Sequence, residues 1–99
     1  CEDIILPVVP KWVEPVWHLF VIRVSNRDAF QQYLKKEEIG TLIHYPVPPH
    51  LSDVYKKDFF ERSSFPISEE LASKVISLPM GPHLSESELD RVCDVIRKK

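Results

Sequence analysis

The nine prolines of this chain fall in groups that divide its 99 residues into short segments. Because proline lacks a backbone N–H and has a fixed φ, each group interrupts helices and central strands. Three prolines lie within residues 1–15, so we expect an extended segment there. A second group, Pro46, Pro48 and Pro49, stops whatever strand precedes it. Regular structure is therefore expected only between these groups.

Three apolar segments between the prolines have the composition of β-strands. Residues 16–24 form a β-branched and aromatic run, which predicts a central strand. Residues 41–45 predict a second strand that ends at Pro46, and residues 75–78 predict a third that ends at Pro79. We therefore expect one small, mainly antiparallel sheet of about three strands.

A first helix is predicted directly after the first strand. Ser25 or Asn26 can cap it, and Phe30 and Leu34 are spaced to share one of its faces. Gly40 is expected to supply the left-handed residue that follows its C-terminus. This helix should pack its apolar face on the sheet.

Three further helical segments follow in the second half of the chain. Residues 51–60 favour a short helix, and residues 68–74 favour another. The pair Ser85 and Glu88 forms a capping box that opens the last helix. Its apolar face is predicted to consist of Leu89, Val92, Cys93 and Ile96. The element order predicts an α+β fold: a two-layer sandwich over residues 16–99, preceded by a linker over residues 1–15.

Composition excludes several broad classes of protein. A hydrophobic fraction of 43% is sufficient for a core, which argues against disorder. Thirteen basic residues against fifteen acidic ones argue against a nucleic-acid binder, and no apolar run is long enough to span a membrane. Residues 1–7 resemble neither a signal peptide nor a chain start, which indicates a fragment or a mature form. Two isolated cysteines, Cys1 and Cys93, favour a reducing, cytoplasmic setting.

Standard catalytic motifs are not found in the sequence. Only Gly40 and Gly81 are glycines, which excludes a glycine-rich phosphate loop. Zinc ligation by His44, His50 and His83 is conceivable, but their spacing does not require it, and we predict no metal site.

The segment around His44 and Tyr45 is the best candidate for a binding site. A strand delivers both side chains to its end, and the prolines that follow stiffen the backbone there. Imidazole and phenol groups can bind phosphate, sugar hydroxyl or carboxylate oxygens. The alternative is structural: both side chains close the sheet edge and bond to the main chain.

Several segments in order resemble the DegT-type (DegT/DnrJ/StrS) sugar aminotransferases. The resemblance is strongest over residues 39–48, IGTLIHYPVP. It extends upstream to WHLFVIR (17–23) and Leu6-Pro7, and downstream to His50-Leu51, to FPISEELA (65–72) and to SLPM (77–80). It spans almost the whole chain, and the segments occur in the family order.

The resemblance implies that the chain is the C-terminal small domain of a fold type I enzyme dependent on pyridoxal 5′-phosphate. Such enzymes are normally homodimers and move an amino group, usually from glutamate, to a keto sugar carried on UDP or dTDP. Their products enter lipopolysaccharide, glycan or antibiotic pathways. The lysine that binds the cofactor would lie in a large N-terminal domain, so we expect no cofactor on this chain and no activity from it alone.

The resemblance also implies a substrate-binding role for His44 and Tyr45, and less directly for His50. Catalytic, cofactor-binding and metal-binding residues are not expected in the chain. A different interpretation remains open from the sequence: a free-standing α+β module that binds a ligand or holds a dimer together.

Overall fold

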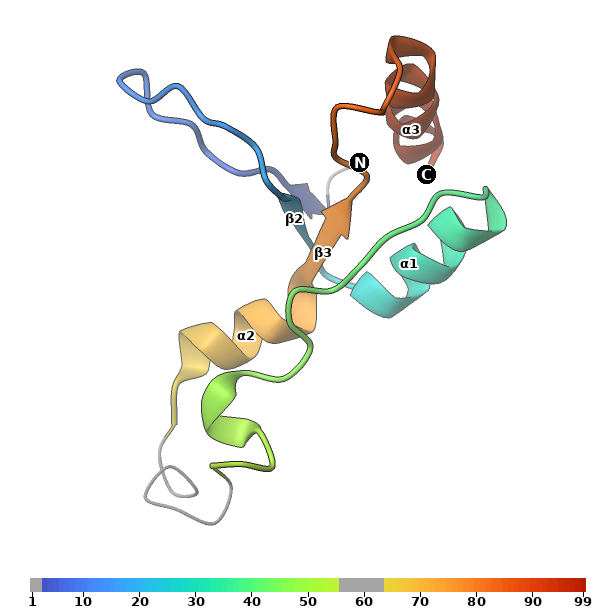
Figure 1. Cartoon of the computed structure of the whole chain (residues 1–99). Coiled ribbons are helices and arrows are strands. Elements are labelled where there is room, and N and C mark those ends of the chain that lie inside the picture. The colour runs from blue at the N-terminus through green and yellow to red at the C-terminus, as the bar shows by residue number, and fades with distance from the viewer. Residues whose placement is uncertain (1–2, 56–63) are drawn as a thin grey trace.

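A three-stranded antiparallel sheet, in the order β1-β2-β3, lies at the centre of the computed structural model (Figure 1). The structure describes residues 3–55 and 64–99. The strands are β1 (Ile4–Ile5), β2 (Phe20–Val24) and β3 (Val75–Leu78). The helices are α1 (Arg27–Lys36), the 3₁₀ helix η1 (Pro49–Leu51), α2 (Pro66–Lys74) and α3 (Glu86–Lys98). The α+β class predicted from the sequence is confirmed.

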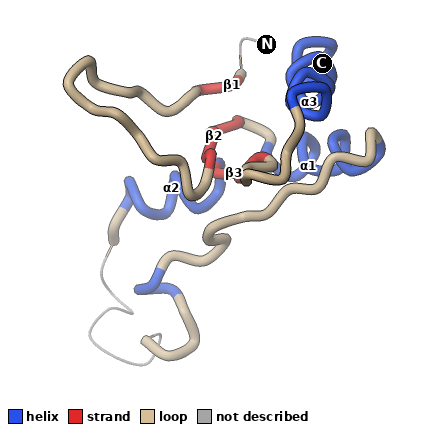
Figure 2. Tube along the Cα trace, turned by 45° about the horizontal axis from the view of Figure 1, so that its top comes forward, coloured by secondary structure: helices blue, strands red, loops and turns tan. Residues whose placement is uncertain are grey.

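The core lies between the sheet and the helices α1 and α3, which lie on the same side of it in both views (Figure 2). Ile22 of β2 is paired with Ile76 of β3, and both are almost fully buried. Helix α1 adds Phe30 and Leu34, as its spacing predicts. Each such side chain contributes about 1.5–3 kcal/mol by burial. These contacts fix β3, and with it the candidate site, against the rest of the chain.

Helix α3 begins as the sequence predicts. The Ser85 hydroxyl accepts from the Glu88 N–H, and the Glu88 carboxylate accepts from the Ser85 N–H, so the capping box is formed. The buried face differs slightly from the prediction. Val92 is buried, but Val95 is the other buried residue, and Leu89 is 46% exposed because it lies in the first turn.

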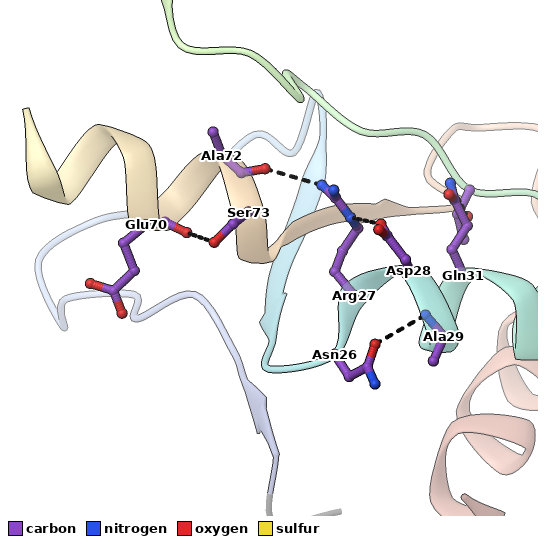
Figure 3. A network of polar contacts seen from close by, with 9 residues as sticks. Asn26, Arg27, Asp28, Ala29, Gln31, Glu70, Ala72 and Ser73 are labelled. Atoms are coloured by element: carbon purple, nitrogen blue, oxygen red, sulfur yellow. Dashed lines mark hydrogen bonds and ion pairs between the residues drawn. The ribbon is translucent and has the colours of Figure 1, made fainter.

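Polar contacts join α1 to α2 (Figure 3). Asn26 is the N-cap of α1, and its side-chain oxygen accepts from the Ala29 N–H at 3.3 Å. Arg27 reaches across and donates from Nη1 to the main-chain oxygen of Ala72, at 3.1 Å. That carbonyl lies in the last turn of α2, where helix carbonyls lack intrahelical donors. The guanidinium therefore ties the start of one helix to the end of the other.

The C-terminus of α1 corrects the prediction made for Gly40. The left-handed residue is Glu38, with φ 61°, and no glycine in the described chain has positive φ. The Glu38 N–H donates to Lys35 O and the Ile39 N–H donates to Leu34 O, which is the Schellman pattern. Buried Ile39 fixes this geometry by packing in the core, so the turn comes two residues before the glycine.

Two strand predictions and one helix prediction differ from the structure. The run 16–24 is a strand only from Phe20, because β3 offers partners only to residues 20–23. The predicted strand 41–45 is wrong: only Leu42 pairs, in a single bridge with Ser77. The chain turns away directly afterwards, before the prolines. The helix predicted for residues 51–60 is replaced by η1 up to Leu51, and residues 56–60 lie outside the described part.

A long loop joins β1 to β2 and extends away from the sheet (Figure 1). It exposes several large apolar side chains, among them Val8, Trp12 and Val16. The division into a linker over 1–15 and a domain over 16–99 stays a prediction. In the parts of the chain that the structure covers, no helix has the length and apolar character of a membrane span.

Candidate functional site

The segment that carries His44 is anchored to β3 by a single residue of that strand. Ser77 donates its N–H to Leu42 O at 2.7 Å and accepts from the Leu42 N–H at 3.2 Å. Gln31 of α1 also donates to the Thr41 hydroxyl, at 3.3 Å. The backbone is therefore fixed two residues before His44, which limits where the imidazole can lie.

His44 and Tyr45 are adjacent, but their surroundings differ. The half-buried imidazole of His44 has its Nδ1 2.8 Å from the Ser77 hydroxyl. Tyr45 is 73% exposed. Its ring packs edge-on against the His44 ring, with the two ring centroids 5.4 Å apart. The peptide bond between them is cis. The His44 ring contacts a side chain of β3, and neither ring is hydrogen-bonded to the main chain in the described structure.

A cleft of ≈ 400 Å³ lies beside His44, which lines it together with His18 and His83 but without Tyr45. The three imidazoles come from three separate segments: the loop before β2, the segment after α1 and the turn before α3. The lining contains no lysine, arginine, aspartate or glutamate. The rest of the wall comes from Leu19, Gly40, Thr41, Leu42, Ser77, Leu78, Pro79 and Met80. Such a surface suits a neutral ring that has polar substituents.

His50 lies elsewhere, in a cavity of ≈ 390 Å³ lined also by Pro49, Tyr55, Phe65 and Ser68. It is 7% exposed, its Nε2 lies 2.8 Å from Glu69 Oε1, and its ring packs edge-on against Phe65. The structure therefore brings His44 and Tyr45 together, and it places His50 in a separate cavity.

Glu69 links η1 to the start of α2. Its carboxylate is hydrogen-bonded to the His50 ring, and it also accepts a hydrogen bond from the Phe65 N–H at 3.2 Å. The hydrogen bond with His50, and then the one from Phe65, lower the pKa of Glu69 below its usual 4.5. The pair holds His50 in a fixed orientation.

Sequence reasoning missed Ser77, His18 and His83. Ser77 is the one polar residue of the apolar strand VISL, and this was the available signal. His18 and His83 are 65 positions apart in the sequence, so nothing local could place them in one cleft.

Two features of the described residues bear on cofactor and metal binding. The least exposed lysine among them, Lys74, has its ammonium 2.6 Å from Glu70, on the surface of α2. It is not the desolvated lysine that Schiff-base chemistry requires. In the same part of the chain, no three histidine, cysteine or acidic side chains gather as a metal site would need.

Comparisons with known proteins agree on one group of relatives. The chain is 47% identical over 93 residues to the dTDP-3-amino-3,6-dideoxy-alpha-D-galactopyranose transaminase of Aneurinibacillus thermoaerophilus, which covers 94% of this chain and 25% of that protein. It is 44% identical over 93 residues to the dTDP-3-amino-3,4,6-trideoxy-alpha-D-glucose transaminase of Streptomyces venezuelae, over 94% of this chain and 24% of that one.

Solved structures show the same likeness in three dimensions. The structure of S. venezuelae DesV in complex with a ketimine intermediate matches with a TM-score of 0.90 and 44% identity, over 97% of this chain and 26% of that one. The structure of ntda from Bacillus subtilis with bound cofactor PMP matches with a TM-score of 0.81 and 26% identity, over 98% of this chain and 23% of that one.

The chain spans about a quarter of the length of the curated relatives it matches. The sequence pattern of one family matches residues 1–97, which is nearly the full length of the chain. The fold, the relatives and this match agree, and the chain belongs to the DegT/DnrJ/EryC1/StrS aminotransferase family.

Proposed function

We propose that this chain is the C-terminal small domain of an aminotransferase that depends on pyridoxal 5′-phosphate and acts on a nucleotide-linked keto sugar. The relatives named above are transaminases of dTDP-linked amino sugars, and one matching structure holds PMP. A further relative, from Acidithiobacillus ferrooxidans, is a UDP-N-acetyl-3-dehydro-alpha-D-glucosamine 3-aminotransferase at 36% identity. These names support a keto sugar on dTDP or UDP as the substrate. Glutamate is proposed as the amino donor from the family resemblance alone.

The cofactor would be held by the part of the protein that lies outside this chain, and it would supply the chemistry of amino transfer. The surface position of Lys74, the least exposed lysine of the described residues, and its pairing with Glu70 support this placement. The relatives' greater length leaves room for a large N-terminal domain. A homodimer of the complete protein is proposed from the family resemblance alone. The product would enter polysaccharide or related amino-sugar synthesis, in the cytoplasm.

The observation that carries the proposal is the position of His44 and Tyr45. His44 lines the cleft and is hydrogen-bonded to Ser77, and Tyr45 presents an exposed phenol next to it. In the whole enzyme these side chains would contact the sugar, hold it in one orientation and help to exclude water. His50 is proposed to support this wall from the neighbouring cavity, through its contact with Glu69.

The test uses the protein encoded by the complete reading frame. Transamination of a dTDP-linked 3-keto-6-deoxyhexose with glutamate is measured for the wild type, His44→Gln and Tyr45→Phe. We expect kcat/KM to fall by about 10–100-fold when a group that positions the sugar is lost. Trp12→Phe, in the exposed loop, is the aromatic control and should keep wild-type kcat/KM. Wild-type kinetics in both site variants would contradict the proposed role.

The chain of 99 residues by itself should show no transaminase activity and no absorption band of a lysine-bound cofactor after incubation with pyridoxal 5′-phosphate. Turnover by this chain would place the cofactor site here and overturn the proposal.

A further inference from the structure

Ser77 is a buried polar residue in the middle of the apolar strand β3. It is 5% exposed, between Ile76 and Leu78, and both of its backbone polar groups are bonded to Leu42. The backbone of Ser77 therefore does not need its hydroxyl as a hydrogen-bond partner. A buried hydroxyl needs a partner of its own, because leaving its hydrogen unpaired costs free energy.

That partner is the His44 imidazole. The Ser77 oxygen lies 2.8 Å from Nδ1 of His44, and within residues 3–55 and 64–99 it has no other hydrogen-bond partner. A hydroxyl carries one hydrogen. If Nδ1 carried a proton and donated it to Ser77, the hydrogen of this hydroxyl would have no acceptor among the described residues, and only a molecule in the cleft that Ser77 also lines could supply one. The lower-energy arrangement has the hydroxyl as donor and a bare Nδ1 as acceptor.

We infer that Ser77 is a positioning residue that holds His44 in the tautomer with its proton on Nε2. When Nδ1 accepts a hydrogen bond from Ser77, the ring proton of a neutral imidazole lies on Nε2, and Nε2 is then a donor. Within the described residues, Nε2 has no partner, and the ring lines the cleft of ≈ 400 Å³. His44 then offers an N–H donor to whatever occupies that space, because its acceptor nitrogen is already used.

An N–H donor in this cleft suits a ligand with an acceptor oxygen, and we assign a carbonyl or a phosphoryl oxygen to that position. Both occur in the substrate class of the proposed function, on which this ligand assignment rests. The tautomer assignment stands on the contact with Ser77 alone.

The tautomer is read from the two imidazole nitrogen resonances of His44 in the 99-residue chain labelled with ¹⁵N-histidine. The spectra are recorded at alkaline pH, where imidazoles are neutral. We expect His44 to show a proton on Nε2 and a hydrogen-bonded Nδ1. Ser77→Ala should move both nitrogens toward the tautomer average of a free imidazole, and Ser77→Thr should restore them. Ser73→Ala removes a hydroxyl on α2 that bonds to Glu70 O, and it should change neither.

A proton on Nδ1 of His44 in the wild type would overturn the inference. So would nitrogen resonances of His44 that are identical in the wild type and Ser77→Ala. The wild-type spectrum decides the tautomer even if a variant fails to fold.

Inorganic pyrophosphate added to the 99-residue chain, and the dTDP-linked keto sugar added to the complete protein, separate the two ligand oxygens. A shift of the Nε2–H signal with pyrophosphate assigns the phosphoryl oxygen. A shift that the keto sugar produces in the complete protein, and that dTDP alone does not produce there, assigns the carbonyl. No shift with either overturns the ligand assignment.

In the complete protein, Ser77→Ala should lower kcat/KM about tenfold, as loss of a supporting hydrogen bond to a functional histidine does, with recovery in Ser77→Thr. If Ser77→Ala lost the Nε2-protonated tautomer of His44 but kept wild-type kcat/KM, the role of His44 in the proposed function would be contradicted. The positioning of His44 by Ser77 would still stand.

Discussion

Tyr33 on α1 donates a hydrogen bond from its phenolic hydroxyl to the main-chain oxygen of Val95 on α3, at 2.9 Å. Val95 lies in the last turn of α3, where the main-chain carbonyls have no intrahelical N–H donor. The contact therefore joins the two helices that cover the same side of the sheet.

Replacing this tyrosine tests how much the contact stabilises the fold. Tyr33→Phe should lower the free energy of unfolding by about 1 kcal/mol, because it removes one hydrogen bond and little apolar area. Urea unfolding measures the change. Tyr45→Phe is the matched control, and it should stay within about 0.5 kcal/mol of the wild type because Tyr45 is exposed. Equal losses in both variants would contradict a specific role for the contact between the helices.

Glu69 should make the stability of the chain sensitive to acid. Its pKa is lowered from 4.5 in the folded state, first by the hydrogen bond with His50 and then by that from Phe65. A carboxyl with a lowered folded pKa contributes stability that is present above its unfolded pKa and is lost as the pH falls through its folded pKa. The stability difference between the wild type and Glu69→Gln should therefore shrink as the pH is lowered from 4.5.

Urea unfolding at a series of acidic pH values follows this difference. Glu14→Gln alters an exposed glutamate in the loop between β1 and β2, and its difference from the wild type should not show the same trend. If the free energies of unfolding of Glu69→Gln and of the wild type fell in parallel below pH 4.5, the prediction would be wrong.

The capping box of α3 should be needed for full stability. Ser85→Ala removes the side chain that accepts from the Glu88 N–H, and it should cost about 1 kcal/mol. Ser85→Thr keeps the hydroxyl and should recover most of the loss. Circular dichroism during thermal unfolding reports both variants, and an Ala variant as stable as Thr would show that the cap is dispensable.

Local signals in the sequence predicted much of the fold because they depend on neighbours in the chain. Ser85 and Glu88 are three residues apart and form the cap as predicted. The strand 75–78 has the predicted bounds, because Pro79 stops it. Phe30 and Leu34 are buried as their spacing predicts.

Pairing across the chain was harder to predict. Residues 41–45 have strand-like composition, but only Leu42 finds a partner, so composition alone gave the wrong length. At the end of α1, the burial of Ile39 decided where the chain turns, and Glu38 took the left-handed position in place of Gly40. Both outcomes depend on tertiary packing, which overrides local preference.

The candidate site was predictable only in part, for the same reason. The residues His44 and Tyr45 lie in one short motif, and the structure places them side by side. The partner Ser77 and the two other histidines of the cleft come from distant segments, so only the folded chain shows that they meet.

Ser77 contacts the segment 42–44 twice, once through its backbone and once through its hydroxyl. Side chains alternate between the faces of a strand, so sliding β3 by one residue against its neighbours would put Ile76 or Leu78 where the hydroxyl now lies. The histidine would then lose its support even though every residue of the cleft was still present. Errors in strand alignment during folding would therefore displace the His44 ring, and mutations far from the cleft that loosen this alignment should break the contact between Ser77 and His44 before they unfold the chain.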